Sequence, residues 1–339
     1  MNVELLERLS NTNGVAGNET EVRELIKNEI KNFVDEIKVD ALGNLITLKK
    51  GRKNRPKVML AAHMDEVGLM VTLIEKTGFL RFVRVGGIDE RILLAKHILV
   101  GKEKIPGVIS AKPIHLTWRK EEDKKVAKIE ELYLDIGAST KEEVEKFVRL
   151  GDYVAFATRF EDLGRVVKGK AFDDRIGCYV LIEILKENYD FPLYGVFTVQ
   201  EEVGLRGARV AGFSVEPDIA FALEGTAAGD APQKKDLSPA TILGRGPAIT
   251  TMDRSIICDK ELVELLVKTA EEKKIPYQFK RPGVGGTDVG RIHLAKEGAK
   301  GGVVAVPCRY IHSPVSLANK EDIDNTIKLM KETLKKLEI

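Results

Sequence analysis

In the parts of the chain before residue 67 and after residue 162, continuous apolar runs alternate with stretches that have apolar residues every three or four positions. The continuous runs, which suit strands covered on both faces of a sheet, are 57–63, 193–200, 218–224 and 301–307. The periodic stretches, which predict amphipathic helices, are 16–37, 173–189, 260–274 and 320–339. Because strands that alternate with helices form parallel sheets, we expect an α/β fold with a mixed, mostly parallel sheet between helices.

The first periodic stretch carries a helix-start signal and leads into a hairpin. Asn18 is a residue type that caps helices, and Glu21 stands three positions later, close to a capping box. Residues 37–51 then alternate around Gly43 and Asn44, a pair typical of a hairpin turn. We therefore expect a helix and a hairpin before the first buried strand.

Residues 67–162 show a different pattern. Short alternating runs separated by glycines replace the long apolar runs, and one helical stretch, 140–150, interrupts them. This pattern is typical of a small β-barrel or sandwich. The charged stretch 118–128 is expected to be an exposed loop. We therefore predict an α/β domain formed by residues 1–66 and 163–339 and interrupted by an inserted β-barrel domain.

Composition limits the number of domains and the kinds of partner. The chain has 339 residues, more than one hydrophobic core usually fills, so two structural units are expected. The formal net charge of +2 gives no electrostatic reason to expect nucleic acid or an anionic membrane as a partner. The first residues lack the continuous apolar segment of a signal peptide, and we expect a cytoplasmic protein.

Charged residues and cysteines add two further expectations. Charged residues make up 31% of the chain and glutamine occurs three times, a combination that favours a thermophilic source. Cys178, Cys258 and Cys308 are far apart and form no CxxC pair, so neither a disulfide framework nor a cysteine-type zinc site is indicated. We expect all three to be small core residues.

Acidic and imidazole side chains follow the apolar runs, where the strands are expected to end. In open α/β sheets ligands bind beyond the carboxyl ends of the strands, so these side chains are candidates for one shared site. They are His63, Asp65, Asp173, Asp174, Glu201, Glu202, Glu224 and His312. The main evidence for a functional site is that several separate apolar runs are each followed by an acid or a histidine, because this observation does not depend on any single motif.

Histidines and carboxylates without thiolates predict a site for divalent metal ions. Asp65 stands two residues after His63, where its carboxylate can accept the second ring N–H and fix the tautomer. Imidazole and carboxylate ligands suit Zn²⁺ or Co²⁺, and Mn²⁺ is a further candidate. Two histidines and three carboxylates, one of them shared, would hold two ions. The spare member of the Glu201–Glu202 pair would then carry the proton.

Plainer interpretations exist for three of the acids. Asp173 and Asp174 stand where the cap and first turn of a helix are expected. Glu224 also suits an ordinary loop. A carboxylate buried beside a strand end is costly, however, unless it is paired or binds a metal ion.

Five segments in order resemble the metal-site motifs of the tetrahedral (TET) dodecameric metallo-aminopeptidases. The segments read AAHMDEVG, AFDDRIG, VQEEVGLRGA, ALEGT and RYIHSP, and the resemblance extends over essentially the whole chain. It implies a zinc-peptidase-like α/β domain with an inserted, PDZ-like dimerisation barrel. It also implies a dodecamer built from dimers, enclosing a cavity that admits short peptides. Members of this family are also called glutamyl or deblocking aminopeptidases, and doubtfully endoglucanases.

The resemblance implies a cofactor of two divalent metal ions per subunit, with Zn²⁺ or Co²⁺ expected. His63, Asp173 and Glu224 would hold one ion. Asp173, Glu202 and His312 would hold the other, so that Asp173 bridges the two. Many relatives carry aspartate in place of Glu224, and the longer side chain leaves the substrate preference open.

Catalytic and substrate-binding roles are implied in the same way. Glu201 would be the general base that takes a proton from the attacking water, and Asp65 would orient His63. The segment from Pro282 to Gly290 resembles the glycine loop that lies near the bound substrate. Its members assigned to substrate binding are Gly286, Thr287 and Asp288. A cap for the following helix explains the last two equally well.

Other functions compete with hydrolysis of the first peptide bond of short peptides. A glycosidase would use Glu201 and Glu202, but it needs carboxyl groups roughly 5–10 Å apart across a sugar bond and leaves the histidines without a role. A non-catalytic metal-binding scaffold is disfavoured because the base Glu201 is present. A related metallo-carboxypeptidase or deacylase is the main alternative. Lys234 and Lys235 would suit acidic substrates, but a solvated loop explains them better.

Overall fold

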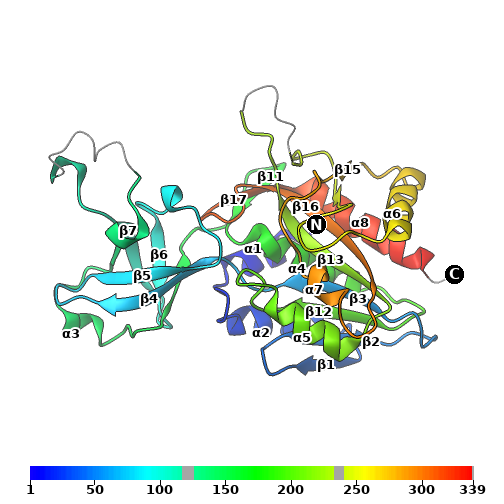
Figure 1. Ribbon diagram of the computed structural model, residues 1–339, viewed down its shortest axis with the longest axis horizontal. Coiled ribbons are helices and arrows are strands. Elements are labelled where there is room, and N and C mark those ends of the chain that lie inside the picture. Colours follow the sequence, from blue (N-terminus) through cyan, green and yellow to red (C-terminus); the bar gives the residue numbers. More distant parts are fainter. Residues whose placement is uncertain (117–125, 233–239, 338–339) are drawn as a thin grey trace.

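The computed structural model describes residues 1–116, 126–232 and 240–337 and contains an α/β part with a β-barrel beside it (Figure 1). The helices are α1 (Val3–Asn11), α2 (Thr20–Ile30), α3 (Lys141–Val144), α4 (Phe172–Leu185), α5 (Arg206–Val215), α6 (Lys260–Glu272), α7 (Val289–Ile292) and α8 (Lys320–Lys336). The predicted exposed loop at 118–128 falls mostly outside the described residues, and Lys234 and Lys235 lie outside them entirely.

The strands form two sheets. Those of the barrel are β4 (Gly68–Ile74), β5 (Leu80–Val85), β6 (His97–Val100), β7 (Ile105–Ser110), β8 (Tyr133–Asp135) and β9 (Tyr153–Phe156). Those of the large sheet are β1 (Glu36–Val39), β2 (Leu45–Lys49), β3 (Val58–His63), β10 (Glu161–Asp162), β11 (Val166–Gly169), β12 (Leu193–Thr198), β13 (Ile219–Ala227), β14 (Ala248–Ile249), β15 (Gln278–Phe279), β16 (Lys300–Arg309) and β17 (Ser316–Asn319).

Four parallel strands form the centre of the large sheet. The strand order is β1-β2-β12-β3-β13-β16-β17-β11-β10, and β12, β3, β13 and β16 run parallel to one another. Antiparallel strands flank them on both sides. The four central strands therefore end at the same edge of the sheet, as a shared site at their carboxyl ends requires.

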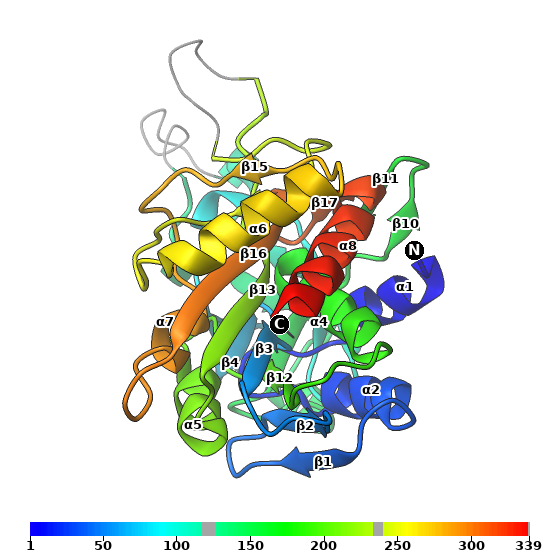
Figure 2. The ribbon, with the colours of Figure 1, turned by 90° about the vertical axis from the view of Figure 1, so that its right-hand side faces the viewer.

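Helices cover both faces of this sheet, because its central strands are apolar on both sides. In β3, Val58, Leu60 and Ala62 pack into one core, and Met59 and Ala61 pack into the core on the opposite face. Helices α1, α2, α4 and α8 contribute to the first core, and α5 and α7 contribute to the second (Figure 2). The predicted mixed, mostly parallel sheet between helices is confirmed.

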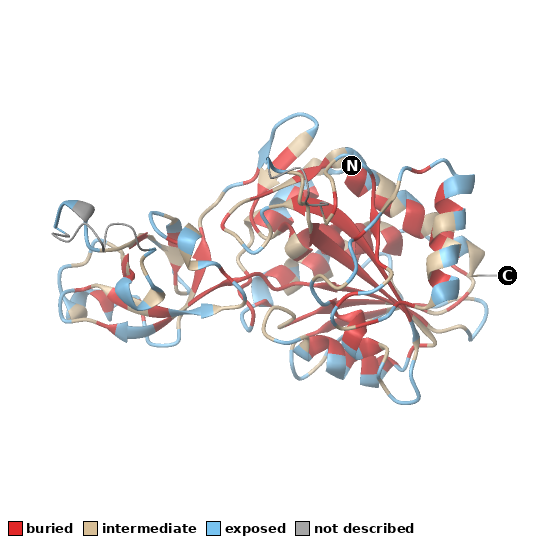
Figure 3. Cartoon of the chain, turned by 45° about the horizontal axis from the view of Figure 1, so that its top comes forward, coloured by how far each residue is buried: buried red, intermediate tan, exposed pale blue. Residues whose placement is uncertain are grey.

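The barrel is closed and has its own hydrophobic core. Its strand order is β4-β5-β8-β7-β6-β9, and β9 pairs with β4 to complete the ring. Inward side chains such as Leu69, Phe82 and Leu134 are buried. The buried apolar residues of the barrel form a cluster of their own, separate from the larger cores of the α/β part, and Figure 3 shows buried residues in both parts. The predicted inserted β-barrel is therefore confirmed, whereas the domain limits at 67 and 162 stay predictions.

Several helix limits differ from the predicted ones. The helix predicted over 16–37 is confined to α2, because residues from Glu36 onwards pair with β2 in the hairpin. Asn18 is not its cap: Glu19 occupies that position and makes no capping hydrogen bond. The helices predicted over 140–150 and after Asp288 are single turns, α3 and α7, and α1 lies outside the predicted elements.

No helix in the described part of the chain is long and apolar enough to span a lipid bilayer. The three cysteines are buried and free, as expected. A cytoplasmic location and a thermophilic source stay predictions.

Candidate metal centre

The carboxyl edge of the parallel strands gathers the predicted acids and histidines. His63 ends β3, Glu224 lies in β13, and the Glu201–Glu202 pair follows the end of β12. Asp173 stands at the start of α4, and His312 follows β16. Residues that are up to 249 positions apart in the sequence are thus brought to one place, as the strand-end pattern predicts.

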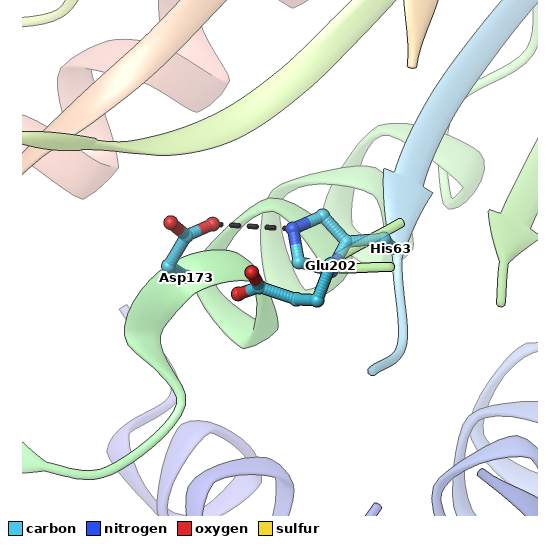
Figure 4. Close-up of side chains that lie close together, drawn as sticks. All are labelled: His63, Asp173 and Glu202. Carbon is cyan, nitrogen blue, oxygen red and sulfur yellow. Dashed lines mark hydrogen bonds and ion pairs between the residues drawn. The ribbon is translucent and has the colours of Figure 1, made fainter. Parts of the chain in front are cut away.

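Asp173 lies between the two histidines. Its Oδ1 is 3.1 Å from His63 Nε2, and its Oδ2 is 3.4 Å from His312 Nε2. Figure 4 shows Asp173 facing the ring of His63, with the carboxylate of Glu202 beside them. Despite burial, which raises it, the pKa of Asp173 is held well below its usual range by hydrogen bonds from His312 and His63. A carboxylate with one oxygen toward each imidazole suits a ligand shared between two cations.

Two groups of residues could each hold a metal ion, because the ligand atoms within each group all lie within 4.8 Å of one another. Both groups include His63. One group contains Asp173 and Glu202, and the other contains Asp174 and Glu224. His312 belongs to neither group, and its Nδ1 lies 3.6 Å from Glu202 Oε2. The arrangement brings all five predicted ligands together, but the predicted division into two sets stays a prediction.

The chemistry of the donor atoms fits divalent cations. The donors are carboxylate oxygens and imidazole nitrogens, which Zn²⁺ and Co²⁺ accept. Glu224 is buried, and its Oε1 has no hydrogen-bond partner among the described residues. Burial and the nearby charge of Asp174 raise the pKa of Glu224 well above its ordinary value. Since a buried oxygen without a partner is costly, a bound cation would remove this cost.

Asp65 makes contacts beyond the predicted one between its carboxylate and the ring of His63. The Nδ1 atom of His63 lies 3.1 Å from the backbone carbonyl oxygen of Asp65, whereas the carboxylate is 3.5 Å away. The two carboxylate oxygens accept hydrogen bonds from the backbone amides of Glu201 and Glu202, each at 3.0 Å. Asp65 therefore contacts His63 mainly through its backbone and holds the Glu201–Glu202 turn through its side chain.

Glu201 stands at the edge of the histidine–carboxylate group. Its Oε2 is 3.9 Å from His63 Nε2. Burial raises the pKa of Glu201 well above its ordinary value, and the carboxylates of Glu224 and Asp288 add to this effect. A carboxylate with a raised pKa that is close to the ligands, yet outside both tight groups, suits a proton acceptor.

Asp174 is a site residue that the family resemblance includes in neither set of metal ligands. Its Oδ2 accepts a hydrogen bond from the His63 amide and its Oδ1 accepts one from the Gly177 amide, both at 3.0 Å. A Cβ atom at Gly177 would lie 2.2 Å from Asp174 Oδ1 and 2.3 Å from the Leu223 carbonyl oxygen, so only glycine fits there. Asp174 thereby ties the end of β3 to α4. The acidic doublet was the available signal, but it also fitted a helix cap.

The loop that follows β5 of the barrel contacts the site. The Nδ1 atom of His312 lies 2.9 Å from the carbonyl oxygen of Gly87, which follows β5. A Cβ atom at the neighbouring Gly86 would lie 3.3 Å from the Cβ of Glu202, so the loop passes close to a second candidate ligand. The inserted segment therefore helps to orient His312.

The three predicted substrate-binding residues differ in burial. Gly286 is exposed, but Thr287 and Asp288 are buried. Asp288 accepts a hydrogen bond from the hydroxyl of Thr198, and its Oδ1 has no partner among the described residues. It stands at the cap position of α7 without making a capping hydrogen bond. The alternative role as a helix cap is therefore wrong for its side chain, and substrate binding stays a prediction.

Comparison with known proteins identifies the family. The profile of the M42 glutamyl aminopeptidase family matches residues 43–329. The chain belongs to this family. The predicted resemblance to the TET metallo-aminopeptidases is thereby confirmed, and membership of M42 makes the chain a metal-dependent aminopeptidase.

Individual M42 relatives match over nearly their full length. A putative aminopeptidase of Acetivibrio thermocellus is 44% identical over 98% of this chain and 98% of its own length. The TET aminopeptidase of Thaumarchaeota archaeon SCGC AB-539-E09 is 38% identical, with a TM-score of 0.95 over 99% of this chain and 97% of its own. The TET1 peptidase of Pyrococcus horikoshii, which can assemble into a tetrahedron or a large octahedral shell, is 37% identical. Its TM-score is 0.86 over 97% of this chain and 98% of its own.

Proposed function

We propose that this M42 enzyme removes residues from the amino end of short peptides with the help of two divalent metal ions. The observation that carries the proposal is the position of Asp173, which has one carboxylate oxygen near His63 Nε2 and the other near His312 Nε2. Glu202 and Glu224 lie next to this group and supply further oxygen donors. Such a set of ligands, with one shared carboxylate, is what a two-metal site needs.

His63, Asp173 and Glu224 would hold one ion, and Asp173, Glu202 and His312 would hold the other. Bound Zn²⁺ or Co²⁺ would supply Lewis acidity, which makes water a better nucleophile and polarises the peptide carbonyl. Asp65 and Asp174 keep this ligand set in place by binding backbone amides.

Glu201 is the proposed general base. Its carboxylate takes a proton from the attacking water and gives it to the amino group that leaves when the peptide bond breaks. Its position supports this role, because its Oε2 lies 3.9 Å from His63 Nε2, beside the candidate ligands but outside both groups of ligand atoms. The neighbouring Glu202 faces His312 instead, at 3.6 Å, which supports a separate role as a ligand.

The proposal includes a homo-oligomer built from dimers, with a dodecamer as the expected form. The similarity to the Pyrococcus horikoshii TET1 peptidase and the closed barrel in the inserted segment support it. Gly286, Thr287 and Asp288 would lie near the bound peptide. The glycosidase alternative lacks support, since Glu201 and Glu202 each face an imidazole at 3.9 Å and 3.6 Å.

Removal of metal should abolish activity toward peptides with a free amino end. We expect dialysis against a chelator to lower kcat/KM at least about 100-fold, because several kcal/mol of transition-state stabilisation depend on the ions. Addition of Zn²⁺ or Co²⁺ should restore it. The measurement compares a free peptide, its N-acetylated form and its C-terminally amidated form.

Each outcome of this assay decides between the alternatives. Cleavage of free and amidated peptides, but not of the acetylated one, would support the aminopeptidase. A preference for the acetylated peptide would point to a deacylase, and loss of activity on amidation would point to a carboxypeptidase. Activity that survives complete metal removal would contradict the proposal.

A further inference from the structure

Four successive backbone amides after β12 donate to side chains instead of to a neighbouring strand. The amides belong to residues 199–202, which contain the Glu201–Glu202 pair. The hydrogen bonds run from Val199 to Asn44 Oδ1 (3.0 Å), from Gln200 to Glu19 Oε1 (3.1 Å), and from Glu201 and Glu202 to the two carboxylate oxygens of Asp65 (3.0 Å each). Three residues far apart in the sequence thus hold one short segment, which we call the glutamate turn (residues 199–202).

The glutamate turn needs external partners because its backbone leaves the strand. Gln200 has a φ of 57°, in the left-handed region that costs a residue other than glycine about 1–2 kcal/mol. At this conformation the amides no longer point along the hydrogen-bonding direction of the sheet. Buried amides without partners are costly, so side chains must replace the strand as acceptors.

Glu19 is well suited to this task. Its side chain is buried, with 4% exposure, although glutamate is almost never buried without a partner. Its Oε1 accepts hydrogen bonds from the Gly17 amide at 2.6 Å and from the Gln200 amide. Burial raises the pKa of Glu19 to about 7, and both hydrogen bonds oppose that rise. Glu19 stands at the cap position of α2 but does not cap it, so its carboxylate is committed to the glutamate turn.

The other end of the glutamate turn is held by an asparagine in a fixed orientation. The Nδ2 atom of Asn44 donates to Asp40 Oδ2 at 2.6 Å and to the Gly207 carbonyl oxygen at 3.0 Å. Its Oδ1 therefore faces Val199. Asn44 and Asp65 thus fix the residues on either side of Gln200, and Glu19 fixes Gln200 itself.

We propose that Glu19 is a positioning residue that holds the glutamate turn in the conformation that places Glu201 and Glu202 at the metal centre. This inference rests on the proposed roles of Glu201 as base and Glu202 as ligand. Glu19 is in neither group of candidate metal ligands, and it contacts the glutamate turn through the amide of Gln200. A small displacement of a catalytic group lowers the rate strongly, so loss of this contact should affect kcat more than KM.

Three variants test the contact by kinetics. We expect Glu19→Ala to lower kcat about 10- to 100-fold while KM changes less than about threefold. Glu19→Gln should stay within about threefold of the wild type, because its amide oxygen still accepts both hydrogen bonds. Glu24→Ala, which removes an exposed carboxylate from the same helix, is the matched control and should be unchanged.

Hydrogen exchange measures the contact without any activity. Mass spectrometry of peptides spanning residues 199–202 should show exchange about tenfold faster in Glu19→Ala than in the wild type or Glu19→Gln, since one hydrogen bond is lost. If Glu19→Ala does not fold, Glu19→Asp replaces it, because the shorter side chain cannot reach both amides and should give the same direction of change.

The two kinds of failure are distinguishable. Unchanged exchange and unchanged kcat in Glu19→Ala, or in Glu19→Asp where that variant replaces it, would overturn the positioning role. A loss in Glu19→Gln equal to that in Glu19→Ala would also overturn it, because the acceptor oxygen is then not what matters. A wild-type protein without metal-dependent aminopeptidase activity would overturn the proposed function instead, while the exchange experiment would still report on Glu19.

Discussion

Replacement of Glu201 by glutamine is expected to lower kcat by about 10²- to 10⁴-fold, because an amide cannot accept the proton that the base must take. The side chain keeps its size, and the backbone amide of residue 201 keeps its hydrogen bond to Asp65. The variant should therefore retain the fold and both metal ions. The measurement combines steady-state kinetics with metal analysis of the purified protein.

A matched control distinguishes the effect of replacing Glu201 itself from a general effect of removing one negative charge. Glu264→Gln makes the same chemical change on the exposed surface of α6 and should leave kcat and metal content unchanged. If Glu201→Gln keeps more than about a tenth of the wild-type kcat with both ions bound, Glu201 is not the general base.

Replacement of Glu202 by glutamine should have a different signature, in which metal is lost along with activity. The Oε2 atom of Glu202 lies 3.6 Å from His312 Nδ1, and its neighbours in the ligand group are His63 and Asp173. Loss of residues that merely orient ligands lowers metal affinity about 10- to 100-fold, so a neutral amide in place of a ligand should cost at least as much. We expect the Glu202→Gln protein to contain about half the metal of the wild type after dialysis against metal-free buffer.

The pair of variants tests the assignment of roles, since the two residues are adjacent and chemically identical. Excess Zn²⁺ should partly restore the activity of Glu202→Gln but not that of Glu201→Gln. The reverse pattern, with metal lost from Glu201→Gln and retained in Glu202→Gln, would exchange their roles. Equal metal content and near-normal activity in both would remove the pair from the proposed mechanism.

The location of the site was predictable from sequence because it depends on topology. Continuous apolar runs indicate parallel central strands, and parallel strands end at the same edge of the sheet. Acids and histidines placed directly after those runs must then meet. His63 and Glu224 illustrate this, since they come from the neighbouring strands β3 and β13, and His63 Nε2 lies 3.8 Å from Glu224 Oε2.

The supporting contacts were not predictable, because they involve backbone groups whose direction depends on local conformation. The sequence does not show that Gln200 has a positive φ, so it gives no reason to connect Glu19 with Glu201. In the same way, the spacing of His63 and Asp65 indicates a contact but not that the backbone carbonyl makes it. The sequence predicts Asp174 at the start of a helix, but its hydrogen bonds to the amides of His63 and Gly177 follow only from the structure.

The limits of helices and strands also depend on tertiary contacts that the local sequence pattern does not show. The apolar period predicts a helix as far as residue 37, but strand pairing takes over at Glu36 because β1 completes the hairpin with β2. The alternating runs of the insert predict strands, whereas the closure of the ring depends on β9 pairing with β4, more than 80 residues earlier. Pairing over such distances leaves no local signal in the sequence.

Crystals of the zinc-loaded protein would test the central claim most directly. Anomalous scattering at the zinc absorption edge locates the ions independently of any assumed ligand. We predict two peaks per subunit, with the Asp173 carboxylate between them, Glu202 and Glu224 on different ions, and Glu201 bound to neither. A single peak, or a peak bound directly by Glu201 in place of Glu202, would contradict it.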